Sequence, residues 1–178
     1  MRKISQIVIH CSATRPDWME GHSAAEKRDE IDRWHKARGW RGIGYHAIID
    51  RDGAFAQGRE VEQIGAHVKG HNLETIGVCL IGGHGAAAHD AFPDHFTDAQ
   101  AGALLAFVEA WREDDPAIII SGHNEYAAKG CPGFDVAGWL KGHGIDARPQ
   151  PAPQIVSDPA PSAPAWLLRP PMRRRARA

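Results

Sequence analysis

Short apolar runs recur along the first 147 residues of the chain, each bounded by glycines or by polar and charged residues. Runs of this length that are rich in isoleucine and valine are typical of buried strands. Two of them are separated only by Arg51-Asp52-Gly53, a tripeptide that indicates a hairpin. The strands that we expect span residues 4–10, 45–50, 54–58, 76–81 and 117–121.

Helical patterns lie between these strands. Two of them begin with a capping box, in which a serine or threonine is followed three residues later by glutamate or glutamine. The expected caps are Ser23 with Glu26, Thr97 with Gln100, and Asp135, and the helices run to Gly39, through Val108 and through Trp139. Strands interleaved with helices imply an α/β fold, in which a mixed central β-sheet is flanked by helices on both faces of a single domain.

Composition divides the chain into two parts. Residues 148–178 hold eight of the 12 prolines, six arginines and one acid, a net charge of +5, so the other 147 residues carry −6 of the total of −1. Proline-rich segments donate few backbone hydrogen bonds and favour extended conformations. We therefore expect a folded domain over residues 1–147 and a mostly disordered tail over residues 148–178.

Within the tail, one segment is suited to contact a surface. Trp166-Leu167-Leu168 precedes four arginines in residues 173–177, a combination that suits weak association with an anionic membrane surface. The alternative is a solvated tail with no function of its own, and its composition favours that alternative.

The cysteines and the N-terminus indicate where the protein is made. Cys11, Cys79 and Cys131 are odd in number and far apart, unlike a disulfide framework, which suits a reducing cytoplasm. The N-terminus is basic and then apolar, but its apolar run is too short for a signal peptide. No apolar run reaches the roughly 18 residues of a membrane helix.

Two histidines and a cysteine are the first candidates for chemistry. His10 ends the first expected strand, His123 follows the last one, and Cys131 lies eight residues further on in a turn-rich loop. Three protein ligands with a fourth position left for water are typical of a catalytic zinc site. Taken alone, however, this spacing does not separate metal ligation from a packed core cysteine and an exposed histidine.

Five short segments then occur in an order that identifies a family. They are His10-Cys11-Ser12-Ala13-Thr14, Gly44-Tyr45-His46, Ala66-His67-Val68-Lys69-Gly70, Ile76-Gly77-Val78-Cys79-Leu80 and Lys129-Gly130-Cys131-Pro132. Together they resemble the phage-lysozyme branch of the type-2 N-acetylmuramoyl-L-alanine amidases, relatives of the peptidoglycan recognition proteins. The resemblance covers residues 4–140. It departs from the usual pattern in the residues that flank His123, and the tail lies outside it.

The resemblance implies a hydrolase that cuts the amide bond between N-acetylmuramic acid and the L-alanine of the peptidoglycan stem peptide. It implies one zinc ion per chain, held by His10, His123 and Cys131, and catalytic roles for Tyr45 and Lys129. Zinc can support this hydrolysis at neutral pH, because it lowers the pKa of bound water to about 7. A cation such as a lysine can in addition stabilise the oxyanion that develops at the amide carbon.

His67 is the remaining candidate. It stands beside Lys69-Gly70-His71, and we expect it to line the substrate groove.

Two other classes of function stay open at this point. One is a non-catalytic peptidoglycan-binding module of the same fold, although such a receptor can lose the cysteine ligand and this chain keeps Cys131. The other is a zinc-stabilised nucleic-acid-binding protein that uses the arginine tail. A domain with a net charge of −6 repels phosphate, so no specific nucleic acid is expected.

The biological setting follows from the same observations. A chain with this resemblance and no signal peptide suits a phage or prophage endolysin, made in the host cytoplasm and acting on the cell wall after release. We expect a monomer. The sequence neither supports nor excludes a regulatory partner such as RNA polymerase.

Overall fold

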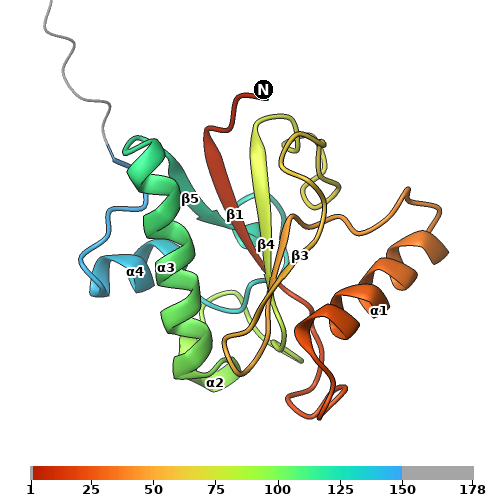
Figure 1. Ribbon diagram of the computed structural model, residues 1–178. Coiled ribbons are helices and arrows are strands. Elements are labelled where there is room, and N and C mark those ends of the chain that lie inside the picture. Colours follow the sequence, from red (N-terminus) through yellow and green to blue (C-terminus); the bar gives the residue numbers. More distant parts are fainter. Residues whose placement is uncertain (1, 150–178) are drawn as a thin grey trace, which may run out of the picture.

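A computed structural model describes residues 2–149 of the chain (Figure 1). The tail expected over residues 148–178 therefore lies outside the described residues, apart from its first two positions. The strands are β1 (Gln6–Cys11), β2 (Ala47–Ile49), β3 (Phe55–Gln57), β4 (Thr75–Leu80) and β5 (Ile119–Gly122). The helices are α1 (Ala24–Ala37), α2 (Phe92–His95), α3 (Asp98–Asp114), α4 (Val136–Gly142) and the 3-10 turn η1 (His123–Glu125).

The five strands form one mixed sheet in the order β3-β2-β4-β1-β5. Strands β2, β4, β1 and β5 run parallel, and only the edge strand β3 is antiparallel to its neighbour β2. Parallel strands end at the same edge of a sheet, so residues that follow β1 and β5 meet there. The expected α/β fold with a mixed sheet is confirmed.

Helices cover both faces of the sheet, as expected (Figure 1). On one face α1 packs over a small cluster that includes Ile31, Ile48 and Cys79. On the other face α3 and α4 pack over the larger core. Strand residues alternate between the two clusters, because successive side chains of a strand point to opposite faces.

The predicted N-terminal caps are found at two of the three expected helices. Ser23 with Glu26 and Thr97 with Gln100 both form the complete reciprocal box at the start of α1 and α3. Asp135 precedes α4 as expected, but its side chain makes no capping bond. The short helix α2 carries no side-chain cap and was not expected.

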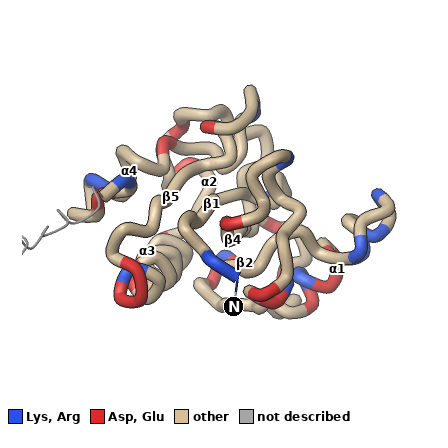
Figure 2. The backbone as a smooth tube through the Cα atoms, turned by 90° about the horizontal axis from the view of Figure 1, so that it is seen from above, with Lys and Arg blue, Asp and Glu red and all other residues tan. Residues whose placement is uncertain are grey.

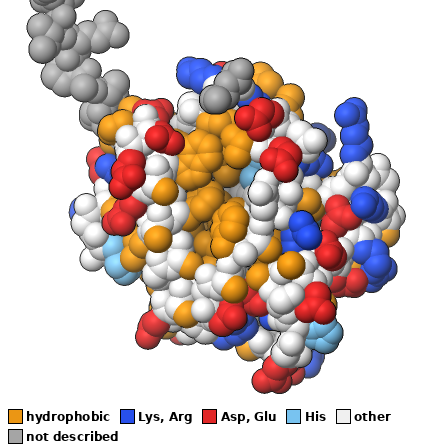
Figure 3. Space-filling model, in the orientation of Figure 1, with side chains coloured by type: hydrophobic (Ala, Val, Ile, Leu, Met, Phe, Trp, Pro, Cys, Tyr) orange, Lys and Arg blue, Asp and Glu red, His pale blue; other side chains and the backbone are white. Residues whose placement is uncertain are grey.

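Charged residues of both signs are spread along the described backbone (Figure 2). An apolar area lies on the α3 side of the sheet (Figure 3). Phe55 of β3 is 54% exposed and stacks against Phe107 of α3, with 6.1 Å between the ring centroids. Within residues 2–149, no helix combines the length and the apolar character that crossing a membrane requires.

Candidate metal centre

The end of β1 and the start of η1 bring two histidines together. His10 lies near the carboxyl end of β1 and is fully buried, and His123 follows β5 directly. The Nδ1 atoms of the two rings are 3.1 Å apart. The expected strand 117–121 ends one residue later than predicted, at Gly122, so His123 stands at the point where the strand turns into η1.

Cys131 completes the cluster from the loop after η1. Its Sγ lies 3.8 Å from His10 Nδ1 and accepts a hydrogen bond from the backbone N–H of Cys11 at 3.2 Å. The loop can approach this closely because residue 130 is glycine, since a Cβ there would overlap the carbonyl oxygen of Ala86. The three ligand atoms of His10, His123 and Cys131 all lie within 4.8 Å of one another.

The electrostatics favour neutral histidines in this cluster. Burial, together with the neighbouring His67, His123 and Lys129, holds the pKa of His10 well below its ordinary value. Burial and the charge of Lys129 also lower the pKa of His123. Neutral imidazole is the form that binds a metal ion, so both rings are in the ligand form at neutral pH.

The pKa of the Cys131 thiol is shifted upward, so the thiol too is neutral in the metal-free protein. A hydrogen bond with the Cys11 thiol, and then burial, raise the pKa of Cys131 above its ordinary value. A bound divalent cation reverses this preference, because a coordinating thiol is deprotonated.

The donor set and its spacing fit a zinc ion. With Zn–N bonds of about 2.0–2.1 Å and Zn–S bonds of about 2.3 Å in tetrahedral geometry, ligand atoms stand about 3.3–3.6 Å apart. The distances of 3.1 Å and 3.8 Å in the cluster bracket that range. Two imidazoles and one thiolate leave a fourth position, as in catalytic rather than structural sites.

Tyr45 lies beside the cluster. Its ring centroid is 5.1 Å from that of His10 and 5.4 Å from that of His35, and its hydroxyl contacts the Cys79 thiol. Burial, reinforced by the nearby Cys79, Cys131 and Cys11, raises the pKa of Tyr45 well above its ordinary value. The phenol therefore stays protonated at neutral pH and can donate a hydrogen bond, but it cannot act as a base.

Lys129 and His67 approach the cluster from two sides. Lys129 is exposed, and its charge contributes to the lowered pKa of both His10 and His123. His67 is buried, with its Nδ1 3.0 Å from His10 Nε2, and burial lowers its pKa to about 3. All six residues expected from the sequence thus lie around one centre, but His67 contacts His10 rather than open solvent.

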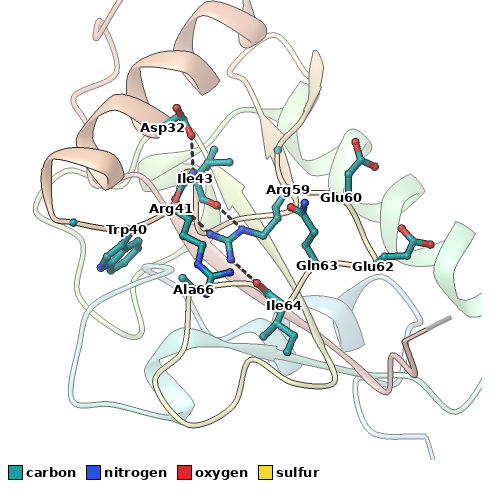
Figure 4. A pocket seen from close by; sticks show the side chains of 13 residues that line it. Asp32, Trp40, Arg41, Ile43, Arg59, Glu60, Glu62, Gln63, Ile64 and Ala66 are labelled. Carbon is teal, nitrogen blue, oxygen red and sulfur yellow. Dashed lines mark hydrogen bonds between the residues drawn. The ribbon is translucent and has the colours of Figure 1, made fainter.

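A solvent-open pocket of about 920 Å³ is lined by Asp32 and by residues of the segments 39–43 and 58–66, and none of the six site residues lines it (Figure 4). A row of rings leads from this pocket to Tyr45. The ring centroid of His35 lies 4.6 Å from that of Trp40 and 5.4 Å from that of Tyr45. Arg41 and Arg59 both line this pocket, and burial, followed by the charge of the neighbouring Arg41, lowers the pKa of Arg59. Among residues 2–149, Arg41 belongs to no ion pair, whereas the guanidinium of Arg59 donates hydrogen bonds to the carbonyl oxygens of Gly42, Ile43 and Ile64. Asp32, Glu60 and Glu62 line the same pocket, so it carries charges of both signs.

Comparison with known proteins identifies the family. The family described as N-acetylmuramoyl-L-alanine amidase matches residues 1–134, which include every residue of the cluster. The chain belongs to this family.

Relatives of the amidase extend the comparison. The endolysin of Enterobacteria phage K11 is 39% identical over 140 residues, which cover 79% of this chain and 87% of that endolysin. The endolysin of Escherichia phage T7 is 39% identical over 133 residues, covering 75% and 83% of the two chains. A solved structure of the amidase LysC from Clostridium intestinale superposes with a TM-score of 0.63 at 24% identity, covering 80% of this chain and 85% of LysC. That last likeness concerns the fold alone.

Sequence reasoning missed several residues that shape the amidase site. Thr75 and Gly77 of β4 lie against the His67 ring, and the thiol of Cys11 contacts Cys131. A glycine within an apolar strand is a signal for close approach of another group, and it marks Gly77. The pairing of Cys11 with Cys131 has no such signal, because the two lie 120 residues apart.

Proposed function

We propose that this chain is a zinc-dependent peptidoglycan hydrolase that cleaves the amide bond between N-acetylmuramic acid and the L-alanine of the stem peptide. The observation that carries the proposal is the His10, His123 and Cys131 cluster, inside a chain of the N-acetylmuramoyl-L-alanine amidase family. We infer one zinc ion per chain, because residues 2–149 hold one such set of three ligands. When bound, zinc supplies a water of lowered pKa and polarises the scissile carbonyl.

Lys129 and Tyr45 supply the remaining groups. Lys129 is exposed beside the two histidines, where its ammonium group can stabilise the negative charge that develops on the amide oxygen. Tyr45 stays protonated, and we assign it a hydrogen bond to the attacking water or to the amide oxygen. In this scheme neither residue holds the metal ion.

The pocket that Trp40, Arg41 and Ile64 help to line is the proposed place for the stem peptide. Arg41, which forms no ion pair among residues 2–149, can bind a carboxylate of such a peptide, and Trp40 and Ile64 offer apolar contact. His67 is largely covered, so in this proposal its contact with substrate is limited to the edge of the groove.

The phage endolysins that resemble this chain suggest its setting. A role as an endolysin would have it made in a host cytoplasm, with the cell wall as its substrate after release. A non-catalytic binding module of the same fold is the alternative. The complete set of metal ligands together with Lys129 supports the enzyme over that alternative.

The direct test is mass spectrometry of purified peptidoglycan after digestion with the protein. We expect free stem peptides that begin with L-alanine, together with glycan strands that carry unsubstituted muramic acid. Cleavage between sugars, or within the peptide, would replace the proposed reaction by another. Binding to peptidoglycan without any new product would favour the binding module.

A further inference from the structure

A row of polar side chains leads away from the metal centre on the α1 side of the sheet. His10 Nε2 lies 3.0 Å from His67 Nδ1, and His67 Nε2 lies 3.3 Å from the hydroxyl of Thr75. That hydroxyl in turn lies 2.7 Å from the carbonyl oxygen of His71. His10, His67 and Thr75 are all buried, so these contacts are made within the protein rather than with bulk water.

The last contact sets the direction of the others. A carbonyl oxygen only accepts, so the Thr75 hydroxyl donates its single proton to the carbonyl of His71. Toward His67 the hydroxyl can then only accept, which places the ring proton of His67 on Nε2. The Nδ1 of neutral His67 is left with a lone pair, and it accepts from the Nε2–H of His10.

This direction leaves the Nδ1 of His10 without a proton. Nδ1 is the atom that faces His123 Nδ1 and Cys131 Sγ. From this geometry we infer that His67 and Thr75 are positioning residues, which hold His10 in the Nε2–H tautomer with its Nδ1 lone pair toward the metal. The inference rests on the proposed metal centre and adds to it a relay that extends to Thr75.

The reverse direction fits the contacts less well. It would need Thr75 to donate to His67 at 3.3 Å and to give up its shorter bond of 2.7 Å to the carbonyl of His71. It would also place a proton on the Nδ1 of His10, between the atoms that are to bind the metal. A second hydrogen bond of this kind commonly fixes the tautomer of a metal-binding histidine.

The fold holds the His67 ring in a slot. Thr75, Gly77 and Cys79 alternate along β4 and so share one face of the sheet. A Cβ at Gly77 would stand 2.6 Å from Cγ of His67, and a Cβ at Gly65 would also overlap the ring. The missing side chains of these two glycines therefore make the space that the ring occupies.

The backbone of His67 is fixed as well. Asn72 accepts two hydrogen bonds through its Oδ1, from the N–H of His67 and from that of Val68, each at 2.9 Å. Ring and backbone are thus held from different sides, which suits a residue whose task is to orient another one.

The test uses the full-length protein and reads the metal and the ring nitrogens without any peptidoglycan. Nitrogen-15 NMR of the metal-free protein is expected to show His10 and His67 as Nε2–H tautomers. In His67→Phe the affinity for zinc, and for cobalt read by its absorption spectrum, should fall about 10- to 100-fold. Thr75→Val should cause a smaller fall and a mixed tautomer at His10, and His67→Gln, whose amide oxygen can accept, should restore most of the affinity.

A destabilised control separates positioning from folding. Thr97→Val removes the side-chain cap of α3, far from the centre, and should lower the unfolding temperature without changing the tautomer of His10 or the metal affinity. The inference is overturned if His10 is an Nδ1–H tautomer, or if His67→Phe binds metal within twofold of the unchanged protein. It is also overturned if metal affinity falls in Thr97→Val as it does in Thr75→Val.

Failure of the proposed function would look different. A protein with the expected tautomers and metal affinities that leaves peptidoglycan uncut would contradict the hydrolase and support the relay. Cleavage of peptidoglycan by a protein whose His10 is protonated on Nδ1 would support the hydrolase and contradict the relay.

Discussion

At the scale of single residues, the site depends on which groups hold the metal and which act on the substrate. His10, His123 and Cys131 converge within 4.8 Å, whereas Tyr45 and Lys129 stand beside them without belonging to the ligand set. Replacing a ligand should therefore remove zinc, whereas replacing Tyr45 or Lys129 should leave zinc bound and slow the reaction.

Replacing Cys131 by serine should remove most of the zinc affinity. A thiolate is a charged, soft ligand, and a serine hydroxyl stays neutral and binds zinc far less tightly. The matched control is Cys79→Ala, a fully buried cysteine of β4 that should affect packing while zinc remains bound at one equivalent. The zinc content of both variants is measured after dialysis. Full zinc content with full activity in Cys131→Ser would contradict the assignment of Cys131 as a ligand.

Lys129→Ala and Tyr45→Phe should keep zinc and lose turnover. An interaction made only in the transition state lowers kcat and kcat/KM together, and loss of an oxyanion-stabilising group costs about 100-fold or more. The expected loss for Tyr45→Phe is smaller, since water can replace part of the hydrogen bond. Lys141→Ala on α4, an exposed lysine away from the centre, is the control and should leave turnover unchanged. Unchanged turnover in both test variants would remove these residues from the mechanism.

At the scale of elements, the ends of β1 and β5 and the loop after η1 carry the site. Sequence patterns predict the strands and the main helices, because apolar runs and capping boxes are local signals. They also place His10 and His123 at strand ends. They do not place Thr75 beside His67 or Cys11 beside Cys131, since those contacts depend on how distant segments pack. The helix α2 was missed because only four residues with no side-chain cap form it.

The loop that carries Cys131 depends on glycine at position 130. Gly130→Ala would place a Cβ against the carbonyl oxygen of Ala86, so the loop must shift and Cys131 must move away from the histidines. We expect lower zinc affinity and a lower unfolding temperature. The matched control is Gly102→Ala within α3, where no atom lies within 4 Å of the added Cβ. That change should raise the free energy of unfolding by about 0.5–1 kcal/mol, because alanine favours helix more than glycine does. Zinc affinity in Gly130→Ala equal to that of the control would show that the loop tolerates the side chain.

At the scale of the whole molecule, two buried histidines away from the ligand set make stability depend on pH. The Nδ1 of His35 accepts from the N–H of Gly44, and the Nδ1 of His46 accepts from the N–H of Gly77. Burial lowers the pKa of each ring to about 4. Both therefore favour the neutral form in the folded protein.

This shift predicts that the metal-free protein loses stability as the pH falls from about 6.5 to about 4. In that range the unfolded chain takes up protons that the folded chain does not bind, so each ring lowers the free energy of unfolding by up to about 1.4 kcal/mol per pH unit. Above about 6.5 neither state binds these protons and the contribution is complete. Urea unfolding at a series of pH values measures the slope. In His35→Gln, whose amide oxygen can still accept from Gly44, the slope should be smaller, and an unchanged slope would contradict the assignment.

The central claim, that one zinc ion bound by His10, His123 and Cys131 supports amide hydrolysis, is tested most directly by zinc titration of the metal-free protein. Release of L-alanine-terminated stem peptides from purified peptidoglycan is followed as zinc is added. We expect no release without metal, a linear rise that ends at one zinc per chain, and no rise in Cys131→Ser at the same zinc concentrations. Full release by protein that elemental analysis shows to be free of metal would contradict it.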